Sequence, residues 1–148
     1  HVTLKFLGNI EPQELVAIDG VLSRIAANTQ PAQGRLHNVG SFPHLRRPRV
    51  LWIGVETYNG MLAALHADLD AALAKLGFSK EIRRFQPHIT LGRIRGNRRL
   101  SALREAVEKQ SVHKAESFKI EHLTLFESRQ RHGSTRYTAL STHSFEAR

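Results

Sequence analysis

Two short stretches, HVTLKFLG at residues 1–8 and PHITLGRI at residues 87–94, share the pattern His-x-Thr-Leu. Both are rich in β-branched and other apolar residues, which favours extended strands. Because residues i and i+2 of a strand point to the same face, we expect the histidine and the threonine of each copy to share one face. This face carries His1 and Thr3 in the first copy and His88 and Thr90 in the second, with Val2, Leu4, Ile89 and Leu91 on the opposite, packed faces.

A chain of 148 residues has the usual size of one domain, and its 41% of hydrophobic residues is typical of a globular protein. It contains no run of about 18 apolar residues, so we expect no membrane span. The absence of cysteine excludes disulfides and thiolate metal sites and agrees with a reducing compartment. We therefore expect a single cytoplasmic domain over residues 1–148, and we expect it to be a monomer.

The sequence is strongly basic, with 22 Lys and Arg residues against 13 Asp and Glu residues and a net charge of +9. Such a balance attracts polyanions, of which nucleic acid is the commonest in a cell. The basic residues cluster at 44–50, 81–85 and 92–99, and the last cluster follows the second His-x-Thr-Leu copy. This placement favours a ligand that carries phosphate.

The spacing of apolar residues and the turn signals between them predict an alternation of helices and short strands. Helices are expected at about 11–27, 60–76 and 99–109. Strands are expected at 1–7, 35–39, 50–55, 87–94, 117–127 and 137–142, with a loop at 40–48 and a turn at 131–136. This order of elements favours the α+β class.

Two imidazoles that face one cleft can act as a general acid and a general base, because histidine titrates near neutral pH. In-line displacement at phosphorus places the nucleophile and the leaving oxygen on opposite sides, so the base and the acid must also lie on opposite sides. Each proton transfer contributes about 10²–10⁴-fold in rate, and the threonine hydroxyls can donate to the non-bridging phosphate oxygens. No H-x-H, HExxH or carboxylate cluster accompanies these residues, so we expect no metal and no cofactor.

The two motifs resemble the paired signatures of the two-histidine (2H) phosphoesterases, and in particular the RNA 2′,3′-cyclic phosphodiesterase branch, historically called 2′-5′ RNA ligase. GSFPHLRRPRVLWIGV (40–55) is similar to the loop and central strand of that family, and LTLFESRQRHGSTRYTAL (123–140) to its C-terminal hairpin. The resemblance implies two pseudo-symmetric lobes, each a small antiparallel sheet with outer helices, around a central cleft. It also implies a strand and a helix ahead of the first motif, so we expect an N-terminally truncated form of the domain.

The resemblance implies a role for each motif residue. His1 would be the general acid that protonates the departing ribose 3′ oxygen, and His88 the general base that activates water. Thr3 and Thr90 would hold the phosphate oxygens, and Arg93 would contact the phosphate. The product would be a 2′-phosphate end, and the reverse direction would ligate RNA ends weakly. The implied partner is RNA, or a nucleotide, with a 2′,3′-cyclic phosphate.

Other residues have two interpretations. Phe42 and Arg46, in the expected loop, are candidates for stacking on RNA bases, although Phe42 would equally fit as a plug at the edge of the core. We interpret Trp52 as a core residue. The segment from His122 repeats His-x-Thr-Leu a third time, but the resemblance assigns it to the hairpin, so we expect His122 not to be catalytic.

Two other functions compete with hydrolysis of cyclic RNA ends. One is a phosphodiesterase acting on another cyclic or 2′-5′ linked nucleotide, because the residues that contact a base cannot be identified from the sequence. The other is a non-catalytic RNA-binding module. Such a module would need the arginines and the aromatic loop, but it has no use for two facing His-x-Thr elements.

Overall fold

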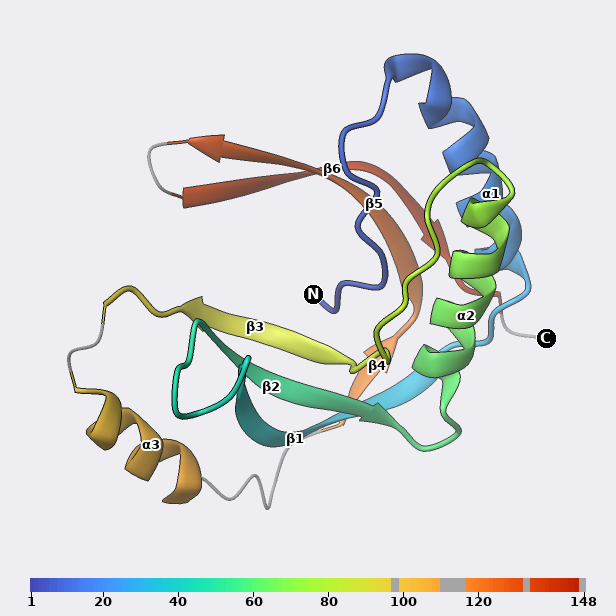
Figure 1. Cartoon of the computed structure of the whole chain (residues 1–148). Helices are drawn as coiled ribbons and strands as arrows, with labels where there is room; N and C mark the ends of the chain where they lie inside the picture. Colours follow the sequence, from blue (N-terminus) through green and yellow to red (C-terminus); the bar gives the residue numbers. More distant parts are fainter. Residues whose placement is uncertain (97–98, 110–116, 132–133, 147–148) are drawn as a thin grey trace.

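The structure, a computed structural model, describes residues 1–96, 99–109, 117–131 and 134–146. Figure 1 shows the order of its elements. They are η1 (Pro12–Glu14), α1 (Leu15–Ala27), β1 (Ala32–Phe42), β2 (Val50–Thr57), α2 (Met61–Ala74), β3 (His88–Arg93), α3 (Leu100–Lys109), β4 (Phe118–Ile120), β5 (His122–Arg131) and β6 (Ser134–Ser144).

The strands form two antiparallel sheets. Four strands pair in the order β3-β2-β1-β4, and β5 and β6 pair as a hairpin. In Figure 1 the hairpin lies above the larger sheet, and the N-terminal segment runs into the space between them. An isolated antiparallel bridge between Val2 and Ile89 attaches this segment to β3. The α+β class and the antiparallel sheets are thus confirmed, with an unequal number of described strands in the two sheets.

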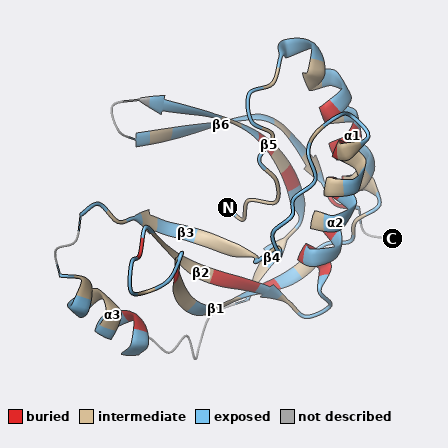
Figure 2. Cartoon of the chain, viewed as in Figure 1, coloured by how far each residue is buried: buried red, intermediate tan, exposed pale blue. Residues whose placement is uncertain are grey.

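The core lies where α1 and α2 pack on each other and on the outer side of the curved strands (Figure 1). Apolar residues of α1 recur every three or four positions and α2 carries a leucine stripe, so each helix buries one face. Figure 2 shows the buried residues gathered on these helices and on the strand segments beside them. The core consists of Ile18, Val21, Leu22, Ala26, Val55, Met61, Leu62, Leu65, Leu69, Leu73, Leu123, Leu125 and Phe145.

Three strand predictions differ from the structure. Residues 1–7 are not a described strand, because their backbone meets β3 only around the bridge at Val2 and a strand requires continuous pairing. β1 extends to Phe42, since its pairing with β2 continues to Val50, so residues 40–42 are strand rather than loop. The strand expected at 117–127 is divided at Glu121 into β4 and β5, which belong to different sheets.

The helix predictions agree with α1, α2 and α3 to within a few residues. The predicted turn at 131–136 includes residues 132–133, which lie outside the described residues. None of the described helices is long and apolar enough to cross a membrane.

Substitutions at two nearby positions of α1 should change the free energy of unfolding in opposite directions. Ile18 is fully buried, so Ile18→Ala should lower the free energy of unfolding by about 2–5 kcal/mol through lost burial and a cavity. A Cβ at Gly20 would meet nothing within 4 Å, so Gly20→Ala should raise it by about 0.5–1 kcal/mol through helix propensity. Urea unfolding followed by circular dichroism measures both changes; a stable Ile18→Ala variant would contradict this description of the core.

Candidate active site

The bridge between Val2 and Ile89 brings the two His-x-Thr-Leu segments together. Around an antiparallel bridge, the residue before one partner lies across from the residue after the other, so His1 lies opposite Thr90 and Thr3 opposite His88. Val2, Leu4 and Ile89 pack against the core, as expected. Antiparallel geometry around the bridge therefore places the four polar motif residues on the other side.

A β-bulge interrupts β3 at Leu91. Its neighbours pair with consecutive residues of β2, Thr90 with Trp52 and Gly92 with Leu51, which leaves Leu91 without a partner. Leu91 is 53% exposed, so the prediction that it packs on the core is wrong, and the bulge is the physical reason.

The bulge also determines where Arg93 points. His88, Thr90 and Arg93 pair with Gly54, Trp52 and Val50, which are alternate residues of β2. Directly paired residues lie on the same side of a sheet, so all three side chains share one face. In an uninterrupted strand the odd-numbered Arg93 would point to the opposite face. The bulge thus brings a cation onto the face that carries the imidazole and the hydroxyl.

Aromatic rings surround His88 on this face. The centroid of its ring lies 5.0 Å from that of Phe42, in an edge-on arrangement, and 6.0 Å from that of Trp52. Trp52 and Phe42 also contact each other, with centroids 5.2 Å apart. The prediction that Trp52 is a core residue is therefore wrong, because β2 alternates and position 52 lies on the face of Thr90 rather than on the face of the buried Val55. Phe42 contacts His88 and lies outside the core cluster, so it is not a core plug, and its stacking on RNA bases stays a prediction.

The hydrogen bonding of His88 defines its tautomer. Nδ1 lies 2.7 Å from the backbone carbonyl oxygen of Gln86. A carbonyl oxygen only accepts, so Nδ1 carries the proton and donates it. In the neutral ring Nε2 is then left with its lone pair, which is the form that accepts a proton from water.

His1 contacts the other sheet. Its ring stacks on Phe126 of β5 with centroids 5.5 Å apart, and it meets Tyr137 of β6 edge-on at 5.0 Å. Both aromatic residues are more than 40% exposed. The sequence offers no spacing that joins residue 1 to residues 126 and 137, so these contacts could be found only from the fold.

His37 of β1 is a third histidine on the sheet face that carries the site. It pairs with Gly54, which in turn pairs with His88 on the far side of β2. A Cβ at Gly54 would lie 2.7 Å from Nε2 of His37, so the imidazole of His37 covers the space that the glycine leaves. From the sequence alone, His37 is one of several histidines that share no recognisable spacing.

Arg46 lies exposed in the loop between β1 and β2. The loop is closed by the N–H of Arg49, which donates to the carbonyl oxygen of Phe42 at 2.8 Å, and it is held by Arg104 of α3, whose Nε donates to the carbonyl oxygen of Leu45. Among the described contacts, none joins Arg46 to the motif residues.

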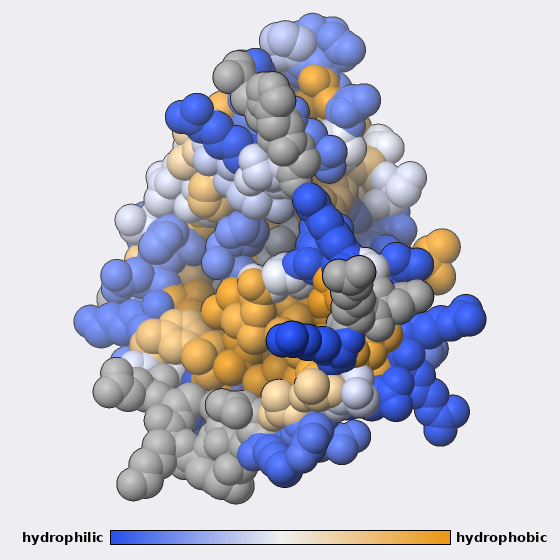
Figure 3. All heavy atoms as spheres, turned by 90° about the vertical axis from the view of Figure 1, so that its left-hand side faces the viewer, coloured by the Kyte–Doolittle hydropathy of each residue, from blue (hydrophilic) through white to orange (hydrophobic). Residues whose placement is uncertain are grey.

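A cavity of about 1000 Å³ adjoins the first motif. Residues 1–10, β5 and the inner sides of α1 and α2 line it. His1, Thr3 and Tyr137 border it, as do His122 and Thr124 of the third motif copy, whereas His88 does not. Figure 3 views the molecule from the open side between the sheets and shows apolar atoms gathered in the middle of that face, with hydrophilic side chains around them. Among the described residues, no three His, Asp or Glu side chains gather as a metal site would require.

Gly40 tests whether Trp52 supports the site. A Cβ at Gly40 would lie 2.4 Å from the indole ring of Trp52, so Gly40→Ala must displace this ring and with it the contact to His88. Because Trp52 is the chain's single tryptophan, we expect a shifted maximum of its fluorescence emission. The His88 ring, which contacts Trp52, should be displaced as well. Gly20→Ala is the control without a clash; unchanged emission in Gly40→Ala would contradict the packing described here.

A family model described as the 2′-5′ RNA ligase superfamily matches residues 1–132. Curated relatives include a Methanocaldococcus jannaschii protein named RNA 2′,3′-cyclic phosphodiesterase, 33% identical over 128 residues that make up 86% of this chain and 70% of that protein. An Aeropyrum pernix protein of the same name is 37% identical over 103 residues, which make up 70% of this chain and 57% of that protein. The chain thus spans between about half and three quarters of the length of these relatives.

Solved structures show the same architecture. A Thermus thermophilus crystal structure superposes with a TM-score of 0.80 at 27% identity, covering 98% of this chain and 77% of that one. E. coli LigT complexed with 3′-AMP superposes with a TM-score of 0.79 at 28% identity, covering 99% of this chain and 77% of that one.

Proposed function

The chain belongs to the 2′-5′ RNA ligase superfamily, and we propose that it hydrolyses the 2′,3′-cyclic phosphate ends of RNA to 2′-phosphate ends. The observation that carries this proposal is the antiparallel bridge between Val2 and Ile89, which gathers two imidazoles and two hydroxyls on one side. The names of the curated relatives support the same substrate. The net charge of +9 suits a polyanionic ligand.

In the proposed reaction, Nε2 of His88 takes a proton from a water molecule as the water oxygen attacks phosphorus. The bond between phosphorus and the ribose 3′ oxygen breaks on the opposite side, and a protonated His1 donates its proton to that oxygen. The products are a 2′-phosphate and a free 3′-hydroxyl, so one water is consumed and the two histidines exchange protonation states. The Gln86 carbonyl supports the role of His88, because it keeps the proton on Nδ1 and leaves Nε2 to act as the base.

Charge that develops on the non-bridging phosphate oxygens would be met by Thr3, Thr90 and Arg93. Hydroxyl and guanidinium donors that already face the reacting phosphate stabilise such charge without reorganising. Arg93 shares the face of Thr90 because of the bulge at Leu91. Phe42, beside His88, offers a ring on which a base can stack, and Arg46 is proposed as an outer contact to the RNA backbone. If the 5′-hydroxyl of a second RNA replaces water, the same displacement produces a 2′-5′ phosphodiester and thus ligation.

Two alternatives remain distinct from this proposal. A different cyclic or 2′-5′ linked nucleotide would use the same two histidines, and E. coli LigT has been crystallised with 3′-AMP, NADP⁺ and ATP. A non-catalytic RNA-binding module would bind through the same cations but would turn over nothing. Product analysis with several cyclic and 2′-5′ linked substrates separates these alternatives.

Turnover of a short RNA that ends in a 2′,3′-cyclic phosphate tests the reaction directly. With EDTA present we expect a 2′-phosphate product, because the proposed chemistry requires only side chains of this chain. His88→Ala should lower the rate by about 10²–10⁴-fold, since it removes the general base. Loss of activity in EDTA, or a His88→Ala variant as active as the wild type, would refute the mechanism.

The pH dependence tests whether two imidazoles transfer protons. One neutral and one protonated histidine are required together, so kcat/KM should follow a bell-shaped profile with both limbs in the range where histidine titrates. A single limb would leave only one of them in a proton-transfer role. The matched control is His122→Ala in the third copy of the motif, which should retain the activity and the profile of the wild type.

A further inference from the structure

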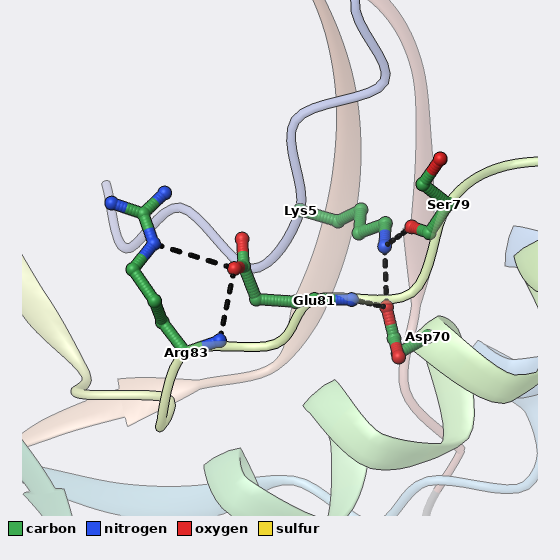
Figure 4. A network of polar contacts seen from close by, with 5 residues as sticks. All are labelled: Lys5, Asp70, Ser79, Glu81 and Arg83. Atoms are coloured by element: carbon green, nitrogen blue, oxygen red, sulfur yellow. Dashed lines mark hydrogen bonds and ion pairs between the residues drawn. The ribbon is translucent and has the colours of Figure 1, made fainter.

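Away from the bridge, a polar network centred on Asp70 connects the N-terminal segment with the segment that leads into β3 (Figure 4). The ammonium group of Lys5 donates to Oδ1 of Asp70 and also to the carbonyl oxygen of Ser79. The same Oδ1 accepts the backbone N–H of Glu81 at 3.1 Å. One carboxylate oxygen of α2 therefore binds both the N-terminal segment and the segment that follows α2.

Both of these segments lack regular pairing among the described residues. Lys5 lies four positions after His1, in a segment that joins β3 only at Val2. Ser79 and Glu81 lie between α2 and β3, in a segment that leads directly into His88. Apolar packing holds each segment against the core but is non-directional, so it does not determine where each segment lies along its axis. A charge-assisted hydrogen bond does impose direction and distance.

The Lys5–Asp70 pair at the centre of the network is partly buried. The side chains of Lys5 and Asp70 are only 10% and 14% exposed, so the pair is less screened than an ion pair at the surface. Lys5, followed by the Glu81 N–H, holds the pKa of Asp70 below its ordinary value of 3.8. A lowered pKa means that the contribution of Asp70 to stability is present above about pH 3.8 and is lost as the pH falls through the folded-state value, so the pair is intact throughout the range where histidine titrates.

Other charged groups surround the pair without replacing it. His66 lies one turn before Asp70 on α2, where its ring stacks on Phe85 at 4.2 Å. Glu81 uses its own carboxylate to accept the backbone N–H and the Nε of Arg83. Lys5 is therefore the cation that holds Asp70, while Arg83 is occupied by Glu81 (Figure 4).

We propose that Lys5 and Asp70 are positioning residues that set the place of the His1 segment relative to the His88 segment. This inference rests on the proposed phosphodiesterase activity. Neither residue contacts the reacting phosphate in this assignment. Their effect is on the alignment of the acid with the base, to which catalysis is far more sensitive than binding is.

The test compares Lys5→Met, Asp70→Asn and the double variant with the wild type on RNA ending in a 2′,3′-cyclic phosphate. We expect each single variant to lower kcat by about 10–100-fold while KM changes by less than about threefold. The double variant should be no slower than the slower single variant, because both changes remove the same contact. Lys5→Arg, which retains the charge, should recover most of the lost kcat.

Arg35→Met is the matched control, because it removes a Lys- or Arg-carboxylate pair of the same kind from the same chain. Arg35 contacts Glu56 at 2.9 Å, but both side chains are about half exposed and neither joins a motif segment. Its kcat should equal that of the wild type. Melting temperatures of all variants ensure that each is compared in its folded state.

A folded Lys5→Met variant with wild-type kcat would overturn the inference, as would losses that multiply in the double variant. If the wild type itself shows no turnover, the proposed function fails, and NMR of the histidine rings still decides the inference. The ring signals of His1 and His88, identified from His1→Ala and His88→Ala, should both shift in Lys5→Met. Unchanged signals would show that the pair does not position the two histidines.

Discussion

The antiparallel contact between Val2 and Ile89 is the constraint on which the candidate active site depends. Two segments that are almost ninety positions apart in the sequence meet there backbone to backbone. Antiparallel pairing relates them by a local two-fold axis, so a repeated His-x-Thr element presents its polar residues from both sides of one point. A parallel contact would place the two histidines side by side with the same orientation, which is unsuited to a displacement that needs the base and the acid on opposite sides of phosphorus.

The two sheets then give the two histidines different surroundings. His88 is half-buried among Phe42 and Trp52, and the Gln86 carbonyl assigns its proton to Nδ1. His1 is exposed and touches Phe126 and Tyr137 of the hairpin. In the proposed reaction one of these histidines acts as the base and the other as the acid, and the structure gives them different neighbours.

The network around Asp70 adds a contact between the N-terminal segment and the segment that leads into β3. The bridge positions them by backbone pairing, and the ion pair positions them through α2, which belongs to the core. Two separated contacts also restrict rotation, whereas a single bridge leaves a segment free to pivot about it. The structure thus places a directional polar contact where two irregular segments must keep a common geometry.

From the sequence alone, the helical periodicity of α1 and α2, the apolar strand β2 and the two His-x-Thr motifs could all be identified, because local spacing encodes which residues face the core. The α+β class and the family resemblance followed from these signals. Three features were decided only by the tertiary structure. The composition of residues 1–7 favours a strand, yet their backbone pairs with β3 only around Val2. Trp52 is predicted to be a core residue, yet the alternation of side chains along β2 places it beside His88. Arg93 lies on the face of Thr90 only because a bulge at Leu91 shifts the alternation of side chains by one residue. The register that creates this bulge belongs to two paired strands, so neither sequence segment contains it by itself.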